Sequence, residues 1–113
     1  MTAFILRLDD PFAADPERVG PKAANLATLT LAGLPTPGGF ALTGDAYRHQ
    51  LQHLGIDDLL RQYNEADVPA SRRISSQIRL ALYERDIAPE ILDPLLAEWR
   101  RQRAGASLGV VRS

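Results

Sequence analysis

Two short apolar runs in the first half of the chain favour β-structure. Residues 3–8, with the sequence AFILRL, form the first run, and Asp9-Asp10-Pro11 ends it. The second run, FALT at residues 40–43, follows the turn-forming sequence LPTPGG. Short apolar runs that are bounded by turn formers are typical of strands, so each run predicts one strand. The segment DPFAADPERVG at residues 10–20 contains two prolines and several other turn formers, and we expect a loop there.

A helix is predicted between the two strands. Gly20-Pro21 is typical of a helix start, with Gly20 as the cap and Pro21 at the first helical position, where its missing N–H costs nothing. Leu26 and Leu29 continue the apolar pattern. Gly33 suits the left-handed position that often follows a helix C-terminus. The pattern therefore predicts strand, helix and strand over residues 3–43.

After Thr43 the apolar residues recur three and four positions apart, which is the helical period. Thr43 is a plausible N-cap, and Asp45 in the first turn complements the helix dipole. Gly55, a linker at residues 64–71 and Gly105 are expected to end helices. Pro94 either begins a helix that Asp93 caps or kinks a longer one. The apolar faces are Tyr47, Leu51 and Leu54; Leu59, Leu60 and Tyr63; Ile74, Ile78 and Leu82; and Leu92, Leu95, Leu96 and Trp99.

The last apolar stretch, SLGVVRS, predicts a terminal strand at residues 107–113. The whole order predicts an α/β (or α+β) fold, in which several helices pack against a small sheet. We expect one domain over residues 1–113, with a helical segment at 44–104 between the strand–helix–strand part and the terminal strand. A core strand normally leads into a connection, so we also expect this domain to be incomplete.

Composition narrows the class of protein. The chain has 113 residues, of which 45% are hydrophobic and 24% are charged, and its net charge is −1. These values are ordinary for one soluble domain or part of one, and give no reason to expect a nucleic-acid or membrane partner. Cysteine is absent, which excludes disulfides and thiolate chemistry and fits a cytoplasmic location. No apolar run approaches the ~20 residues of a membrane span.

Lys22 is the most informative candidate for chemistry. It is the single lysine among thirteen basic residues, and it lies in the first turn of the predicted helix. A cation there meets the positive end of the helix dipole, at a cost of about 0.3–1 kcal/mol. A phosphate bound at the helix N-terminus would explain Lys22, but a plain surface charge would also be tolerated. The segment is not a Walker A loop, which needs a glycine directly before the lysine and a hydroxyl directly after it.

Other candidate residues have simpler interpretations. His49 and His53 have the i, i+4 spacing of a metal pair, but no third ligand is apparent, so we expect structural or solvated roles. Trp99 and the tyrosines are expected to pack in the core or lie half-buried instead of stacking on a base. The arginines of the second half alternate with acidic residues, as on solvated helix faces. We assign no catalytic residue and no metal ligand in this chain.

Residues 19–47 carry a longer motif, VGPKAANLATLTLAGLPTPGGFALTGDAY. It resembles the opening of the nucleotide-binding domain in the family of phosphoenolpyruvate synthase, pyruvate phosphate dikinase and rifampicin phosphotransferase. Members typically begin with V-G-G-K-[AG]-A-N-L, continue with A-G-L-P-V-P-P-G-F, and start a helix with T-x-D-A-Y. The sequence VVRS at 110–113 is similar to the family's V-A-V-R-S-S strand. Pro21 replaces the second glycine of this pattern, and Gly38 replaces the second proline of its adjacent P-P pair.

The resemblance implies the N-terminal portion of an ATP-grasp-like domain that binds ATP and starts phosphoryl transfer. In the family, the β- and γ-phosphates lie between a lysine of the first motif and an arginine of the V-R-S strand. These roles fall on Lys22 and Arg112, with the backbone of Gly20 and Ala23 as secondary candidates. Mg²⁺ is expected with the nucleotide. Its ligands, the glycine-rich lid and the domain with the catalytic histidine would lie outside this chain.

Three hypotheses follow. The leading one is an N-terminal part of an ATP-dependent dikinase-type phosphotransferase, inactive alone, whose partners are ATP and the rest of the enzyme or a complementing subunit. The alternative is a free-standing, non-catalytic interaction module derived from that fold, with its last strand open to β-strand addition. The third is a helix-rich structural domain in which Lys22 is a surface charge. The phosphate acceptor, whether pyruvate, an antibiotic or a glucan, is not specified by this sequence.

Overall fold

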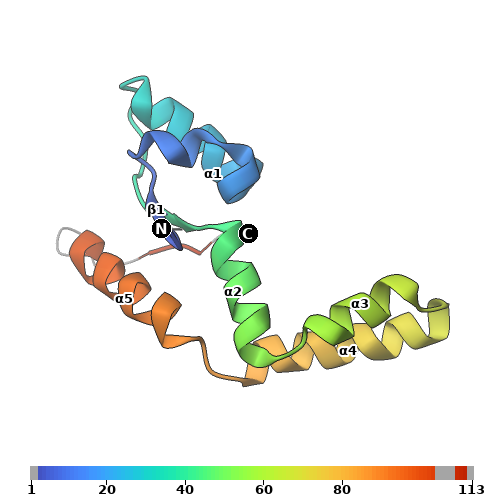
Figure 1. Cartoon of the computed structure of the whole chain (residues 1–113). Helices are drawn as coiled ribbons and strands as arrows, with labels where there is room; N and C mark the ends of the chain where they lie inside the picture. Colours follow the sequence, from blue (N-terminus) through green and yellow to red (C-terminus); the bar gives the residue numbers. More distant parts are fainter. Residues whose placement is uncertain (1–2, 104–108, 112–113) are drawn as a thin grey trace. The chain divides into compact units, whose positions relative to one another are not determined.

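The structure is a computed structural model that describes residues 3–103 and 109–111 (Figure 1). Its described residues fall into two compact units, one made of the residues up to Tyr47 and from Pro89 onward, the other of Arg48–Ala88. Two strands and several helices confirm the predicted α/β class. In chain order the elements are β1 (Ile5–Arg7), the 3₁₀ helix η1 (Pro11–Ala14), α1 (Pro16–Leu31), β2 (Phe40–Leu42), α2 (Gly44–Leu54), α3 (Asp57–Glu65), α4 (Val68–Glu84) and α5 (Pro89–Arg103).

The sheet in the first unit is a two-stranded antiparallel pair of β1 and β2. Leu6 pairs with Ala41, and the flanking pairs are Ile5 with Leu42 and Arg7 with Phe40. Leu6 is buried while Arg7 is exposed, as the alternating faces of a half-buried strand require. Both predicted strands are confirmed, although each is shorter than the apolar run that predicts it.

The core of the first unit joins this sheet to α1 and η1. Its buried members are Leu6, Leu8, Ala13 and Ala27. The small side chains of α1 and η1 let the helical backbones approach Leu6 of β1 and Leu8, just after β1, closely. Half-buried residues complete the cluster: Ala14, Val19, Ala23, Leu26 and Ala41.

The loop expected at residues 10–20 is wrong, because most of it is helical. The side chain of Asp10 accepts a hydrogen bond from the Phe12 N–H at 2.9 Å and caps η1. Asp15 accepts one from the Glu17 N–H at 2.9 Å and caps α1. A proline follows each cap at the first helical position. The same Asp-Pro pairs that resemble turn formers are therefore helix start signals here.

The second unit contains the end of α2 together with α3 and α4. Leu51, Leu54, Ile56, Ile74 and Ile78 form its buried core. These residues come from the apolar faces that the spacing predicts, together with Ile56. The half-buried residues around them are Leu59, Leu60, Ala66, Ala81 and Leu82.

Two helix boundaries in the second unit test the predicted stops. Gly55 has a φ of 69° and follows the last residue of α2, so the predicted stop is confirmed. The linker expected at residues 64–71 is mostly wrong, because α3 continues to Glu65 and α4 begins at Val68. The Asp67 carboxylate accepts a hydrogen bond from the Ala70 N–H at 2.9 Å and caps α4.

Helix α5 belongs to the first unit and packs against β1. It begins at Pro89 and runs through Pro94, so the alternative of a helix that starts at Pro94 is excluded. Gly105 and most of the expected terminal strand lie outside the described residues. The described residues 109–111 carry no strand, and the terminal strand stays a prediction. None of the helices in the described ranges is long and apolar enough to span a bilayer.

Candidate nucleotide-binding site

Helix α1 consists of two helical segments with a break at Gly20. The backbone of Gly20 has φ 83° and ψ 166°, a conformation that is essentially restricted to glycine. A Cβ placed on Gly20 would meet no atom within 4 Å, so backbone conformation and not crowding requires the glycine. The chain resumes its helix at Pro21. This confirms the predicted roles of Gly20 and Pro21, although a further helical segment precedes them.

The restarted segment has a buried face and an exposed face. Ala24 and Ala27 are buried, and Ala23 is half-buried against the same core. Lys22 and Asn25, three residues apart and therefore neighbours on one helix face, are exposed. The structure thus places Lys22 at the solvent-facing start of this segment, with Ala23 turned toward the core. Asn25 is a polar residue of the same face that the sequence analysis does not identify as a candidate. Its position three residues after Lys22 could have identified it, because residues at this spacing share a helix face.

The start of the restarted segment combines backbone N–H groups with a cation. Gly20 has no side chain that could accept a hydrogen bond from the N–H groups that follow, and Pro21 has no N–H to offer. The first backbone N–H groups of the segment are therefore those of Lys22 and Ala23. The helix dipole and the Lys22 ammonium add positive potential at the same place. This combination suits an oxyanion such as phosphate.

The C-terminal end of α1 leads into the turn before β2. Gly33 has a φ of 81°, its N–H donates to the Thr30 carbonyl at 3.0 Å, and the Leu34 N–H donates to the Leu29 carbonyl at 3.1 Å. The predicted left-handed position at Gly33 is thereby confirmed. The hydroxyls of Thr30 and Thr36 lie 2.8 Å apart and join the helix end to the turn. The turn continues through Gly38 and Gly39, whose φ values are 72° and 126°.

The second expected phosphate ligand, Arg112, lies outside the described residues, so its role stays a prediction. The neighbouring Gly109 packs against Trp99: a Cβ at this position would overlap Cη2 and Cζ3 of the indole. Trp99 is half-buried in this contact, which confirms its expected packing role. The corresponding expectation for the tyrosines is wrong. Tyr47, Tyr63 and Tyr83 are all exposed.

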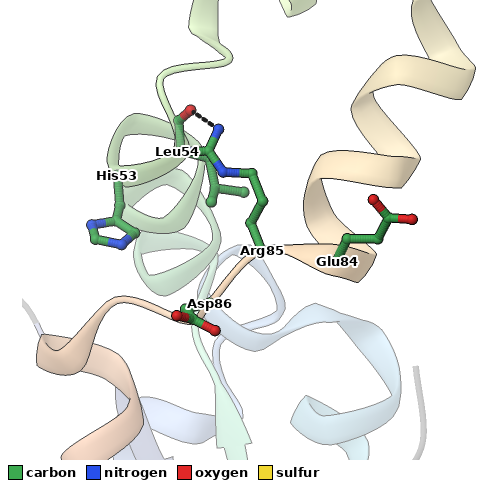
Figure 2. Close-up of a pocket in the computed structure, with 5 residues that line it drawn as sticks. All are labelled: His53, Leu54, Glu84, Arg85 and Asp86. Atoms are coloured by element: carbon green, nitrogen blue, oxygen red, sulfur yellow. Dashed lines mark hydrogen bonds between the residues drawn. The ribbon is translucent and has the colours of Figure 1, made fainter.

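The two histidines lie in the second unit on α2. His49 is half-buried, and the exposed His53 borders a hollow of about 320 Å³. Figure 2 shows this hollow, with Arg85 turned toward the end of α2 and the side chains of His53 and Glu84 on opposite sides of it. The Arg85 guanidinium donates to the Leu54 carbonyl at 2.9 Å and so caps α2. Within residues 3–103 and 109–111, no three His, Asp or Glu side chains are grouped as metal ligands.

Comparison with known proteins identifies the family. Residues 16–113 match the model of the pyruvate phosphate dikinase AMP/ATP-binding domain. The chain belongs to this family. The resemblance carried by residues 19–47 is confirmed, and so is the assignment of the chain to a nucleotide-binding domain.

Curated relatives support the same assignment. The chain is 30% identical to the phosphoenolpyruvate synthase of Neisseria meningitidis over 91% of its own length and 14% of the relative. It is 36% identical to the phosphoenolpyruvate synthase of Pseudomonas aeruginosa over 82% of its length and 13% of that protein. A probable phosphoenolpyruvate synthase of Staphylothermus marinus is 31% identical over 86% of the chain and 12% of the relative. The chain therefore spans less than one sixth of the length of each of these enzymes.

Proposed function

We propose that this chain is the N-terminal part of a nucleotide-binding domain in an ATP-dependent, dikinase-type phosphotransferase. The observation that carries the proposal is the restart of α1 at Gly20-Pro21. It places the exposed Lys22 cation in the first turn of a helix segment, in a chain that belongs to an AMP/ATP-binding family. The expected single domain of residues 1–113, incomplete in this chain, is part of the same proposal.

The proposed ligands of the ATP phosphates are Lys22 and Arg112, supported by the backbone at Gly20 and Ala23. Lysine offers a compact charge on a flexible stem, whereas arginine holds phosphate oxygens with a planar fork. Phosphoryl transfer depends mainly on positioning and on stabilising the charge of the phosphoryl group, so two convergent cations suit it. Mg²⁺ would accompany the nucleotide on carboxylates that other parts of the enzyme supply. A cytoplasmic location would agree with the absence of cysteine.

Exposed apolar side chains in the first unit support a role within a larger protein. Leu29, Leu31, Leu34 and Leu42 are each more than 40% exposed, and Val111 is 98% exposed. Leu29, Leu31 and Leu34 lie within six residues of each other at the end of α1, and exposed apolar side chains that gather on one surface are suited to packing against further protein. The rest of the phosphotransferase is the partner that we propose for them. Phosphoenolpyruvate synthesis, the activity in the names of the relatives, is the reaction we propose for the parent enzyme.

An ATP titration of the ¹⁵N-labelled chain, followed by NMR at constant pH and ionic strength, tests the phosphate site. We expect saturable shifts centred on Gly20–Asn25 and on Arg112. Lys22→Ala should weaken ATP binding about tenfold or more, which corresponds to loss of one charge-assisted contact of about 1.5–3 kcal/mol. Lys22→Arg should restore only part of the affinity, because the rigid fork does not reproduce the ammonium geometry.

Arg73→Gln is a suitable control, because Arg73 is an exposed cation in the other unit. If Lys22→Ala and Arg73→Gln weaken ATP binding equally, the effect comes from net charge alone and the proposed site is rejected. The proposal also predicts that the chain alone does not turn over ATP. Release of phosphate or AMP by the purified 113-residue chain would contradict its role as a binding part of a larger enzyme.

A further inference from the structure

The second unit contains a surface hollow that neither the family resemblance nor the proposed ATP site uses. The hollow lies between α3 and α4 and has a volume of about 360 Å³. That is within the range of pockets that hold small molecules, about 300–1,000 Å³. No carboxylate contributes to its lining. The lining residues are Tyr63, Ser71, Arg72, Ser75, Ser76 and Arg79.

Two arginines of α4 flank the hollow. Arg72 and Arg79 are seven residues apart, which is two helical turns, so both lie on the same face about 10 Å apart along the axis. Within the described part of the chain, neither guanidinium makes an ion pair or a hydrogen bond. Other arginines of this unit differ: Arg61 pairs with Asp58 at 2.8 Å, and Arg85 donates to the Leu54 carbonyl.

The hydroxyl groups that line the hollow divide into two kinds. Ser71 donates to the Val68 carbonyl at 2.9 Å, and Ser76 donates to the Arg72 carbonyl at 3.1 Å, so their protons are already used. No described group accepts the hydroxyl protons of Ser75 and Tyr63. The hollow therefore offers two guanidinium forks and two hydroxyl donors, and no anionic group of its own opposes a bound anion.

We propose that this hollow binds the phosphate group of a small anionic ligand. Guanidinium groups bind phosphate oxygens through paired, charge-assisted hydrogen bonds, and hydroxyl donors can complete the coordination of the remaining oxygens. The hollow beside His53 lacks these properties, because Glu84 and Asp86 line it and its arginine caps α2. The site is separate from the one at Lys22, which belongs to the other unit.

Titration of the ¹⁵N-labelled chain with inorganic phosphate tests this site, with sodium chloride adjusted to hold the ionic strength constant. We expect saturable shifts of the backbone amides from Ser71 to Arg79 and of the side-chain Nε–H groups of Arg72 and Arg79. Arg72→Gln and Arg79→Gln should each weaken binding at least fivefold, and the double variant should abolish it. Arg73→Gln, on the same helix but outside the hollow, should leave the affinity unchanged within twofold.

A second titration with AMP distinguishes free phosphate from a phosphate monoester as the source of the group. Tighter binding of AMP at Ser71–Arg79 would assign a monoester, and equal or weaker binding would assign inorganic phosphate; either result supports a phosphate site. The wild-type titrations decide the question even if a variant fails to fold, which circular dichroism would show. Linear shifts that do not saturate with either ligand, or equal weakening by Arg73→Gln, would overturn the proposal.

Discussion

Gln50 of α2 and Ala88, at the end of the segment that follows α4, are joined by a hydrogen bond from the Ala88 N–H to Gln50 Oε1 at 2.9 Å. The same side chain donates from Nε2 to the Asp86 carbonyl at 3.0 Å. The side-chain amide of Gln50 thus both donates to and accepts from the backbone of this segment, as the backbone of a neighbouring strand would. Ala88 is fully buried, and Gln50 supplies the hydrogen-bond acceptor for its N–H.

Gln50→Ala should therefore lower the free energy of unfolding by about 1–3 kcal/mol, because it leaves a buried N–H without a partner. Urea denaturation measures this change. Gln52→Ala is the matched control, since Gln52 is exposed on the same helix and has no such contact, and it should change stability by less than about 0.5 kcal/mol. If both variants unfold at the same urea concentration, the contact does not hold the segment.

Gly20→Ala should destabilise the fold by about 1–3 kcal/mol, because the backbone conformation at Gly20 is one that a Cβ disfavours. The cost is conformational, since the added methyl group would meet no neighbour. Gly44→Ala is the control: Gly44 lies in the first turn of α2 and does not have a positive φ. Thermal and urea unfolding of both variants would check this. If Gly20→Ala has the same stability as the wild type, α1 continues through residue 20 without a break.

The elements that follow from local pattern could be predicted from the sequence. Ile74 and Ile78 are buried as their spacing requires, and Gly20, Gly33 and Gly55 have the backbone roles that their context indicates. These features depend on residues within one or two turns of each other. Periodicity and glycine placement therefore carry enough information to identify them.

Features with ambiguous local signals were harder to predict. Asp15 before Pro16 and Asp67 before Val68-Pro69 fit turns and helix caps equally well, and only the helix that follows decides between them. The exposure of the tyrosines depends on which other elements pack beside each ring, and this is not encoded in the local sequence pattern. The contact between Gln50 and Ala88 joins residues 38 positions apart, and no local pattern marks it.

For the candidate site, the sequence identified Lys22 and its motif, and the structure adds the break at Gly20 that starts a new helix segment beside it. The hollow at Arg72 and Arg79 was not predicted, because arginines among acidic residues resemble an ordinary solvated helix face. The packing of α3 against α4 decides which of these arginines have an acidic neighbour and which do not.

Gly38→Pro restores the proline of the family pattern and should nevertheless destabilise this chain. Gly38 has a φ of 72°, whereas proline fixes φ near −65°. Forcing proline into an incompatible conformation costs more than the gain of about 0.4–1 kcal/mol that a compatible site gives. Differential scanning calorimetry should show a lower Tm for Gly38→Pro. A raised Tm would mean that the turn before β2 adopts the geometry of the proline-containing relatives.

Glu98 should make the stability of the first unit dependent on pH. Its carboxylate accepts hydrogen bonds from Arg101 Nη2 at 2.6 Å and Gln102 Nε2 at 2.9 Å, and Arg7 Nε lies 3.9 Å away. The hydrogen bond from Arg101 is the main cause that lowers the pKa of Glu98 below the ordinary value of 4.5, with smaller contributions from Gln102 and the charges of Arg101 and Arg7; partial burial opposes them.

Because the folded-state pKa of Glu98 is depressed, the stability that it contributes is present above pH 4.5 and is lost as the pH falls through the lowered folded value. Glu98→Gln should therefore flatten the decline of Tm below pH 4.5 while lowering Tm at pH 7. Asp93→Asn is the control for removing one carboxylate from α5, because Asp93 is exposed on the same helix. Parallel Tm curves for wild type and Glu98→Gln between pH 7 and pH 3 would show that the contacts between Glu98 and the two arginines do not stabilise the fold.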